Sequence, residues 1–572
     1  MFRENTNYQQ PELFGISHQL TKKQLKLFEQ SVEHCFFNKV FCLIDEKHFS
    51  VLYSETHSRP NVAVNQLVGS LILKHLFDWT YEELFKHLSF NLLTRHAIGI
   101  DKLDTDIYAE ASLFNFQNRL INYFSETGQD LLMDVFDSLT LDQLKQFGLK
   151  SDIQRGDSFL IGSNILDYNR IQLLIEVLKR LYLVLDEQDK TTYKNCFAAY
   201  IDKTSGQYIY RIEKGDLPKE LMKLAQHYYT LHKNLVSKYS QIHAFEIFSR
   251  VYYEHFIVAS DKIEVRLSNE LHSGILMSPD DLEATFRKKA RKSSKGYVGH
   301  LSETANQENE FQLITDLALE PNNIGDAELL EKRLPKMIQK TPDLCEYFTD
   351  GLYGGPEVDK ILEPNNIKQY QSGIRGRRSY GGLRIHQNPD KSIWVRCSGG
   401  QDVKAIKRKG WSATFDNAIC SNCPLEKLCV TKVYGIKKEQ PYRRWHFQKK
   451  KILSHLRINN FDTLPDSRKT LRANVEASVR QLQFGMKNSK VRVRTKVRIS
   501  AYLTLTAIAT NLKRIHNYLN SLEYWDFSMF LEIKASINSL FVNDGLFHFQ
   551  INTNTNHNKS ALKSELKVVC TN

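Results

Sequence analysis

Ser467-Arg-Lys-Thr-Leu-Arg-Ala-Asn-Val-Glu-Ala-Ser-Val-Arg-Gln-Leu-Gln-Phe-Gly-Met-Lys487 is the stretch of sequence that decides the fold, because it predicts a helix with one carboxylate among bases. Arg472, Glu476 and Arg480 follow at steps of four and share one face, with Lys487 nearly on the same side. Periodicity alone also allows a solvated face on which arginines balance the glutamate. The opposite, core-facing stripe consists of Leu471, Val475, Val479, Leu482 and Met486.

Composition indicates a soluble protein of several domains. The 572 residues suffice for about three or four domains, and the content of 41% hydrophobic and 25% charged residues is typical of globular proteins. No apolar run approaches the roughly 18 residues of a membrane span, and the first twenty residues do not resemble a signal peptide. Nine cysteines in so long a chain do not predict a disulfide scaffold. A cytoplasmic protein that makes no membrane contact is therefore expected.

Positive charge is concentrated in one part of the chain. Residues 351–500 contain 32 lysines and arginines against 11 acidic residues, whereas the whole chain has a net charge of +13. The rest of the chain is therefore net acidic. A local basic region is the expected footprint of a nucleic-acid backbone, although solvated basic faces also occur in unrelated proteins.

Alternating helix-like and strand-like patterns predict a mixed α/β layer fold preceded by an all-α domain. The apolar run at Asn65–Trp79 and the capped start at Thr80 predict neighbouring helices. The expected organisation is a helical domain for DNA binding or oligomerisation at residues 1–150, core strands at 151–165 and 295–374, a helical insertion at 166–294, a basic cysteine-containing insertion at 375–465, C-terminal helices of the core at 466–520, and an extension with a tail at 521–572.

Three carboxylates occupy positions from which they can meet. Asp157 stands at the start of a predicted strand, Asp350 follows a short buried strand, and Glu476 lies on the predicted helix. Strand ends and adjacent helices converge on one crevice of an open α/β sheet. Because clustered acids repel one another, we expect them to hold Mg²⁺ or Mn²⁺, which prefer oxygen ligands. Each aspartate alone would be an ordinary turn or cap residue.

The chain resembles bacterial insertion-sequence transposases of the Asp-Asp-Glu (DDE) superfamily, which have a helical N-terminal domain and a ribonuclease-H-like core. The resemblance runs from about Asn65 to Leu519. It rests on Leu67–Leu93, Phe114–Leu120, Arg155-Gly-Asp-Ser158, Ser163-Asn-Ile165, Gly296–Thr304, Thr315–Asn323, Thr349-Asp-Gly-Leu-Tyr-Gly354, Gly373–Arg377, Asn474-Val-Glu476 and Ala509–Arg514.

This resemblance implies a DNA transposase that hydrolyses phosphodiester bonds at element ends and then transfers the strand, using two Mg²⁺ or Mn²⁺ ions on Asp157, Asp350 and Glu476. It also implies double-stranded element ends and target DNA as partners, a homodimer or larger complex on DNA, and a place at the bacterial nucleoid. A catalytically inactive DNA-binding derivative and a simple metal nuclease remain alternatives. Asp152 and Asp316 compete as first and second acids.

The last helix departs from the signature of related transposases. They often carry Tyr, Arg, Glu and Lys on this helix, and only Arg472 and Glu476 fit here. Lys469 stands in place of the tyrosine and Gln483 in place of the lysine. Phosphate contacts are expected from Arg472 and from other bases in this region, namely Arg480, Lys487, Arg492 and Arg494.

The basic insertion offers a second metal site and further DNA contacts. Its cysteines have the spacing C-x22-C-x2-C-x5-C, which suits a structural zinc ion, an iron–sulfur cluster, or no metal. Two aromatic-laced basic runs predict phosphate contacts and a tryptophan stacked on an unpaired base, although both tryptophans also suit a core. The residues are Cys397, Cys420, Cys423 and Cys429 for the metal, and Lys407, Arg408, Trp411, Arg443, Arg444 and Trp445 for DNA.

Overall fold

The structure is a computed structural model that describes residues 1–9, 15–54, 60–102, 104–259, 262–289, 292–372, 382–435 and 440–540. The chain divides into two compact units, Met1–His516 and Asn517–Asn572. The second unit is described only where helix α20 (Lys496–Leu540) continues into it. Most of the predicted tail, and the stretch Gly373–Arg377, lie outside the described residues. None of the described helices is long and apolar enough to cross a membrane.

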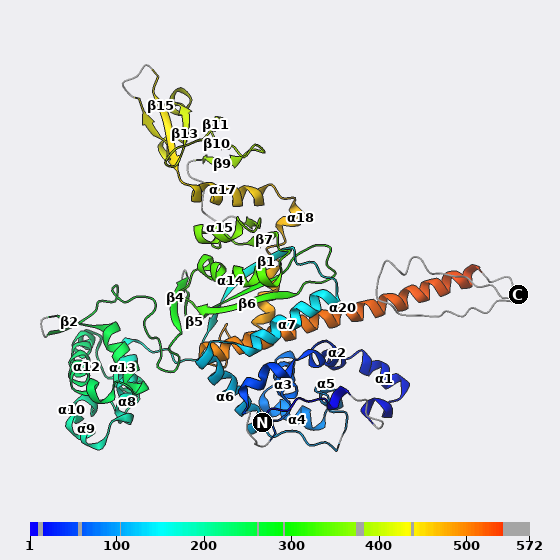
Figure 1. Ribbon diagram of the computed structural model, residues 1–572. Coiled ribbons are helices and arrows are strands. Elements are labelled where there is room, and N and C mark those ends of the chain that lie inside the picture. Colours follow the sequence, from blue (N-terminus) through cyan, green and yellow to red (C-terminus); the bar gives the residue numbers. More distant parts are fainter. Residues whose placement is uncertain are drawn as a thin grey trace. The chain divides into compact units, whose positions relative to one another are not determined.

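A mixed six-stranded sheet forms the core of the first unit (Figure 1). Its strands lie in the order β4-β5-β1-β7-β8, and β6 also pairs with β5. Strand β5 is antiparallel to β1, β4 and β6, whereas β7 is parallel to β1 and β8 is parallel to β7. The bounds are β1 Ile153–Gly162, β4 Thr285–Lys289, β5 Lys292–Thr304, β6 Ile314–Pro321, β7 Glu346–Thr349 and β8 Lys368–Gln371. The predicted mixed α/β fold is confirmed, but β4 lies within the segment assigned to the helical insertion.

Helices pack on both faces of this sheet. Ser158 of β1 donates a hydrogen bond to Asp326 (2.8 Å) at the start of α14 (Asp326–Lys340). Arg155 of the same strand instead donates to the carbonyl of Leu471 (3.1 Å), shortly before α19 (Val475–Leu482). Because alternate residues of a strand point to opposite faces, α14 and α19 cover opposite faces. Helix α15 (Pro356–Leu362) shares a buried apolar cluster with α14.

The N-terminal part of the chain is helical, as predicted. Thr80 begins α4 with a capping box in which its hydroxyl accepts from the Glu83 backbone and the Glu83 side chain binds back. The helices are α1 Lys22–Glu29, α2 Val32–Lys39, α3 Val64–Phe77, α4 Tyr81–Phe90, α5 Leu92–Ala97, α6 Glu110–Thr127 and α7 Leu131–Gln146, with 3₁₀ turns at Asn7–Gln9, Ile16–Gln19, Phe41–Leu43 and Glu46–Leu52.

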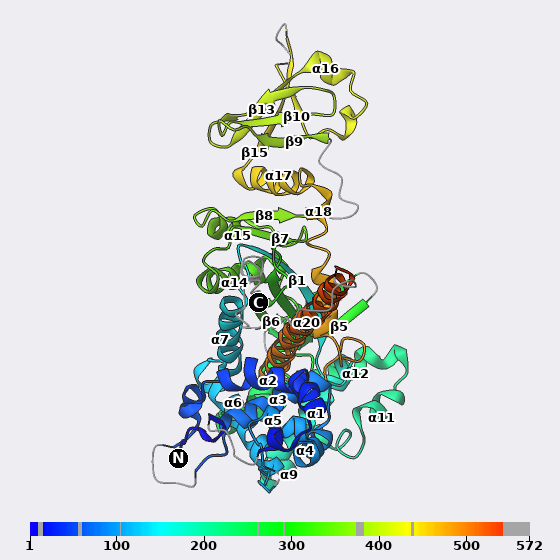
Figure 2. The same cartoon turned by 90° about the vertical axis from the view of Figure 1, so that its right-hand side faces the viewer.

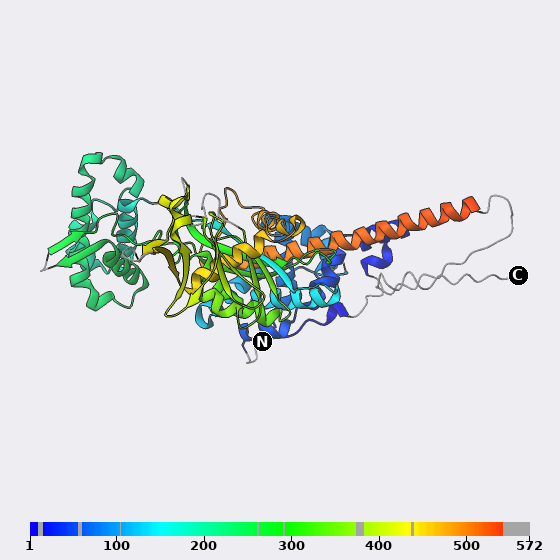
Figure 3. The same ribbon diagram turned by 90° about the horizontal axis from the view of Figure 1, so that it is seen from above.

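The insertion after β1 is a helical unit with its own apolar core (Figure 3). Leu174, Leu178, Tyr228 and Phe248 are fully buried in that core. Its elements are α8 Arg170–Val184, α9 Glu187–Thr192, α10 Lys194–Phe197, α11 Ser205–Tyr210, the 3₁₀ turn Lys214–Asp216, α12 Leu217–Tyr239, α13 His243–His255, and the hairpin of β2 Phe256–Ala259 with β3 Lys262–Val265. Helices thus make up most of the described part of this insertion, which also contains strands β2, β3 and β4.

The cysteine-containing segment forms a small β module (residues 382–435 and 440–447; Figure 2). One sheet has the order β11-β10-β9 and the other β12-β13-β15-β14. Helix α17 (Lys449–Asp462) follows and bonds to both the module and the core, through Asn459 to the Ile385 carbonyl (2.6 Å) and Arg457 to Gln371 (3.1 Å). The bounds are β9 Arg384–Gln387, β10 Ile393–Arg396, β11 Asp402–Lys404, β12 Ile406–Lys407, β13 Trp411–Asp416, α16 Asn417–Ser421, a 3₁₀ turn at Glu426–Leu428, β14 Lys432–Tyr434 and β15 Tyr442–Phe447.

The stretch 467–487 is not one continuous helix. It contains the end of α18 (Asp466–Lys469), a tight turn, and α19. In a continuous α-helix the Val475 N–H would donate to the Leu471 carbonyl. Here that N–H donates to Arg472 (3.3 Å), and the Leu471 carbonyl accepts from Arg155 instead. The predicted stripe still holds in part, since Leu471, Val475 and Leu482 are buried.

Candidate active site

Asp157 lies in the middle of strand β1, not at its start as the sequence suggested. Its carboxylate accepts hydrogen bonds from the Ser158 N–H (2.9 Å) and from Arg472 (2.9 Å), and its side chain is 13% exposed. Gly156 permits the close packing beside it, because an added Cβ would lie 2.0 Å from the Tyr347 hydroxyl on β7. The first candidate acid is therefore held rigidly by the central strand.

Asp350 follows directly after β7, the strand that pairs in parallel with β1. Its carboxylate accepts the Leu352 N–H (2.8 Å), which fixes the turn after the strand. The sequence prediction of a carboxylate at the carboxyl end of a buried strand is confirmed. Two of the candidate acids thus stand on neighbouring strands.

Glu476 lies in the first turn of α19, with 56% of its side chain exposed. Arg472, one helical turn earlier, donates from Nη1 to Glu476 (3.0 Å) and from Nη2 to Asp157 (2.9 Å). The guanidinium therefore lies between two acids that are more than three hundred residues apart. Its Nε is buried and has no hydrogen-bond partner among the described residues.

The three acids share one electrostatic environment. Burial raises the pKa of the Asp157 carboxyl to about 6, although the charge of Arg472 and the Ser158 N–H act in the opposite direction. The negative charges of Asp350 and Glu476 raise this pKa further. Asp157 and Glu476 share the Arg472 guanidinium, and Asp350 follows the strand that pairs with β1.

A buried network fixes α19 against the sheet. Glu303 of β5 is fully buried and faces Arg155 in the β1–β5 register. It accepts hydrogen bonds from Arg155 (2.7 Å), Ser478 of α19 (2.6 Å) and Arg514 of α20 (2.9 Å). Arg155 stands two residues before Asp157, and Ser478 stands two residues after Glu476. The network therefore sets the helix that carries Glu476 against the strand that carries Asp157.

Two family models match the chain. A model described as "Transposase DDE domain" matches residues 392–516, and one described as "Transposase domain (DUF772)" matches residues 25–119. These two matches indicate an insertion-sequence transposase of the DDE type. The DDE match includes Glu476, whereas Asp157 and Asp350 lie outside both matched ranges. No curated protein and no solved structure matched this transposase.

Transposases of this type generally use divalent metal ions. The donor chemistry of the three acids fits Mg²⁺ or Mn²⁺, because carboxylate oxygens are their preferred ligands. Among the described residues, however, no group of three or more His, Cys, Asp or Glu side chains is already placed to hold a metal. At the three acids, the cation of Arg472 instead balances two of the charges.

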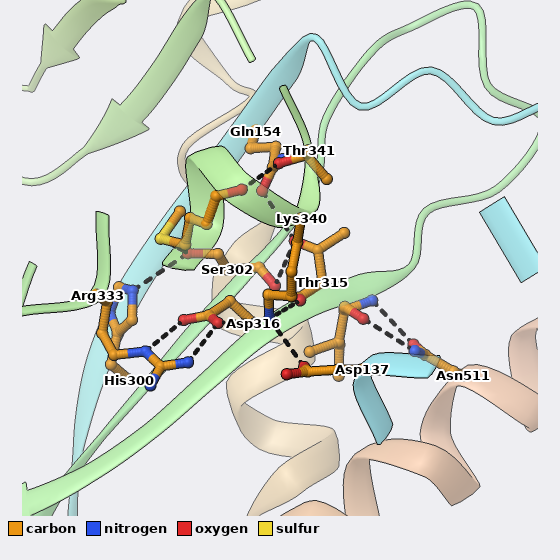
Figure 4. A network of polar contacts seen from close by, with 12 residues as sticks. Asp137, Gln154, His300, Ser302, Thr315, Asp316, Arg333, Lys340, Thr341 and Asn511 are labelled. Carbon is orange, nitrogen blue, oxygen red and sulfur yellow. Dashed lines mark hydrogen bonds and ion pairs between the residues drawn. The ribbon is translucent and has the colours of Figure 1, made fainter. Parts of the chain in front are cut away.

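Asp316, the competing second acid, belongs to a different network (Figure 4). It lies opposite Ser302 on the face covered by α14, and it is fully buried. Arg333 binds both of its oxygens (2.9 and 2.6 Å), and Lys340 bridges it (2.7 Å) to Asp137 (2.9 Å) of α7. Burial alone would raise the pKa of Asp316, but these two cations hold it well below its usual range. Asp316 is thus paired within the structure and faces away from Asp157.

Asp152, the competing first acid, precedes β1 and accepts a hydrogen bond from Asn306 (2.7 Å). It lies five residues before Asp157, and alternation places it toward the other face of the sheet. Asp157 shares the Arg472 guanidinium with Glu476, whereas Asp152 bonds to Asn306, so Asp157 is the better first acid.

The predicted DNA-contacting bases divide into free and paired groups. Arg480, Lys487 and Arg492 are exposed near the end of α19 or just after it. Arg494 is also exposed, but it forms an ion pair with Asp280 (3.0 Å) of the helical insertion.

In the β module, the residues that were predicted to contact DNA differ in their exposure to solvent. Lys407 and Arg408 are exposed, and Trp411 is half-buried against the module core. Trp445 is buried in that core, and Arg443 is held by Glu426 and Asn417 (3.3 Å). Neither ring face of Trp445 is thus available to a base, whereas Arg444 remains accessible at the surface.

The four cysteines of the module line one cavity of about 20 Å³. All four are free thiols. A Cβ added at Gly399 would lie 3.5 Å from the Cys397 sulfur and 3.7 Å from the Cys423 sulfur, so these two sulfurs approach from the same side. The side chain of Gln401 donates to Cys420 (3.4 Å). The four cysteines thus lie around one cavity. Among the described residues, however, they do not form a group that is already placed to hold a metal.

Sequence reasoning missed the positioning residues of the site. Glu303 lies in a stretch that carried the family resemblance, but a glutamate in a strand did not signal burial. Arg155 offered a clearer signal, because it precedes Asp157 by two residues and so shares its face. Arg514 ends a stretch that also carried the resemblance, but neither Arg514 nor Ser478 could be linked to Glu303, because both lie on helices far from it in sequence.

Proposed function

We propose that the protein is a DNA transposase that catalyses metal-dependent phosphodiester hydrolysis and strand transfer at insertion-sequence ends. The observation that carries this proposal is the Arg472 guanidinium, which joins Asp157 of β1 (2.9 Å) to Glu476 of α19 (3.0 Å), in a chain matched by two transposase models. Asp157, Asp350 and Glu476 would hold two Mg²⁺ or Mn²⁺ ions. When bound, such ions activate the attacking oxygen and stabilise the leaving one.

The sheet order supports a ribonuclease-H-like core. Strands β6, β5 and β1 form an antiparallel row, and β7 and β8 continue it in parallel with β1. This places Asp157 in the middle of the sheet and Asp350 at the end of the next strand. The insertions after β1 and after β8 leave this order unbroken, which agrees with the proposed domain organisation.

Arg472 has two roles in this proposal. Without metal and DNA it neutralises Asp157 and Glu476, which would otherwise repel each other. On DNA binding its guanidinium contacts the scissile-strand phosphate. Arg480, Lys487, Arg492 and Arg494 hold the flanking phosphates.

The remaining modules serve assembly and stability. The helical domain that contains the second family match binds DNA ends or a second copy of the chain, because joining two ends requires a dimer or a larger complex. Zinc bound to Cys397, Cys420, Cys423 and Cys429 stabilises the β module, since four thiolates suit a closed tetrahedral site.

A strand-transfer assay separates this function from its two rivals. Duplexes that carry the element ends are incubated with target DNA and Mg²⁺ or Mn²⁺. A transposase gives joined products, a nuclease gives only cut products, and an inactive DNA-binding derivative gives retained but uncut DNA.

A further inference from the structure

The four-stranded sheet of the β module has two unlike faces. Its inner face packs Ala413, Phe415, Trp445 and Phe447 into the module core. Because side chains alternate along a strand, the residues between these point outward. The outward set on β15 is Tyr442, Arg444 and His446, and its cross-strand neighbours are Tyr434 and Lys432 on β14 and Thr414 and Ser412 on β13.

Planar side chains cover this outer face. The rings of Tyr434 and Tyr442 lie nearly parallel, with centroids 6.0 Å apart and planes at 13°. The Arg444 guanidinium lies 4.9 Å from the centre of the Tyr442 ring and 5.8 Å from that of Tyr434. Its Nε donates to the Thr414 hydroxyl (3.1 Å), which fixes its position over the rings. The edge of His446 meets the Tyr434 ring at 6.1 Å.

The charge of this face is positive. Lys432 lies opposite Arg444 in the β14–β15 register, and its side chain is exposed. The one carboxylate in register with Tyr442 is Asp416, which caps α16 by accepting the Ala418 N–H (2.8 Å). Aromatic rings and cations thus occupy the same surface.

We propose that this outer face binds single-stranded DNA. Unpaired bases expose their flat surfaces and stack on aromatic rings or guanidinium planes, whereas bases in a duplex cover one another. Lys432 and Arg444 lie beside the rings, where they can contact phosphates. The inference rests on the proposed function in one respect, because a cut DNA end would supply the single strand. Binding of a single strand does not itself require cleavage. The tyrosines thus take the stacking role that the sequence suggested for Trp411 or Trp445.

The test uses the full-length chain in EDTA, so that no strand is cut. Binding of a fluorescent oligodeoxythymidine and of a duplex of equal length is measured by anisotropy. Replacing both tyrosines (Tyr434→Ala with Tyr442→Ala) should weaken single-strand binding at least about fivefold, the lower end for one lost stacked base. The double phenylalanine variant keeps the rings and should bind within about twofold of wild type. Tyr210→Ala, at a tyrosine that is 91% exposed on the helical insertion, is the matched control and should bind normally.

Three results would overturn the inference. These are unchanged binding by the double alanine variant, equal loss by the phenylalanine variant, or an equal or greater loss of duplex binding. If the alanine variant unfolds, photocrosslinking of wild type to iodouracil-substituted DNA decides, since crosslinks must map to Tyr434 or Tyr442. Asp350→Asn should bind the single strand normally in EDTA. Cleavage that persists in this variant would therefore contradict only the proposed function and leave the binding inference standing.

Discussion

Arg472 and Asp157 are 315 residues apart in sequence, and their side chains meet at 2.9 Å. This contact joins the segment before α19 to the middle of β1. The same guanidinium reaches Glu476 (3.0 Å), so one cation balances two of the three acids. In the absence of metal, Arg472 thus balances the negative charge of the acids, as a divalent ion is proposed to do in the active complex.

The raised pKa of Asp157 predicts a pH dependence of stability in metal-free protein. The folded-state pKa is about 6 and the ordinary value is 3.8. Protonation thus favours the folded state, and this contribution is fully present below about pH 4 and is lost as the pH rises through about 6. It corresponds to about 3 kcal/mol. Urea denaturation in EDTA, repeated across this pH range, should show that the free energy of unfolding of Asp157→Asn lacks this pH dependence. An equal pH dependence in wild type and variant would contradict the raised pKa of Asp157.

Glu303 is predicted to be a main determinant of core stability. Glu303→Gln leaves Arg155 and Arg514 buried with a weaker partner, and breaking a buried ion pair costs about 3–5 kcal/mol. The matched control is Glu320→Gln on the adjacent strand β6, whose partly exposed pair with Lys496 (3.3 Å) should cost less than about 1 kcal/mol. Urea denaturation at neutral pH measures both. Equal costs would show that the network does not anchor α19.

The zinc proposal predicts metal in the purified protein. We expect one zinc ion per chain by elemental analysis, and its loss in Cys423→Ser. Cys345→Ser, at an exposed cysteine outside the module, should retain the metal. Chelation should lower the melting temperature, because a structural metal stabilises only the folded state. Iron in place of zinc would indicate a cluster, and no metal in freshly prepared protein would mean that the four thiols are free.

The sequence predicted those parts of the molecule that depend on local pattern. The capping box at Thr80 and the carboxylate after β7 were recognisable because caps and strand ends have short-range signals. The continuous helix at 467–487 was wrong because the Leu471 carbonyl bonds to Arg155, a partner more than three hundred residues away. Periodicity contains no information about such a competitor.

The candidate site was predictable in its acids but not in its supporting residues. Asp157, Asp350 and Glu476 were proposed from their type and position, and the structure brings Asp157 and Glu476 to one guanidinium, that of Arg472. The burial of Trp445 and of Glu303 depends on which sheet face meets a core, and this is decided by pairing between distant strands. The sequence therefore located the chemistry more readily than the packing that holds it.

The most direct test of the central claim is strand transfer by Asp350→Asn, measured with element-end duplexes in Mg²⁺ or Mn²⁺ beside salt-dependent DNA binding. Asp152→Asn is the control, because Asp152 precedes β1, the strand that carries Asp157, but its side chain bonds to Asn306. The account predicts that Asp350→Asn loses at least roughly 100-fold in joined product, keeps the affinity and salt slope of wild type, and that Asp152→Asn stays active. Joined product at the wild-type level from Asp350→Asn would contradict the account.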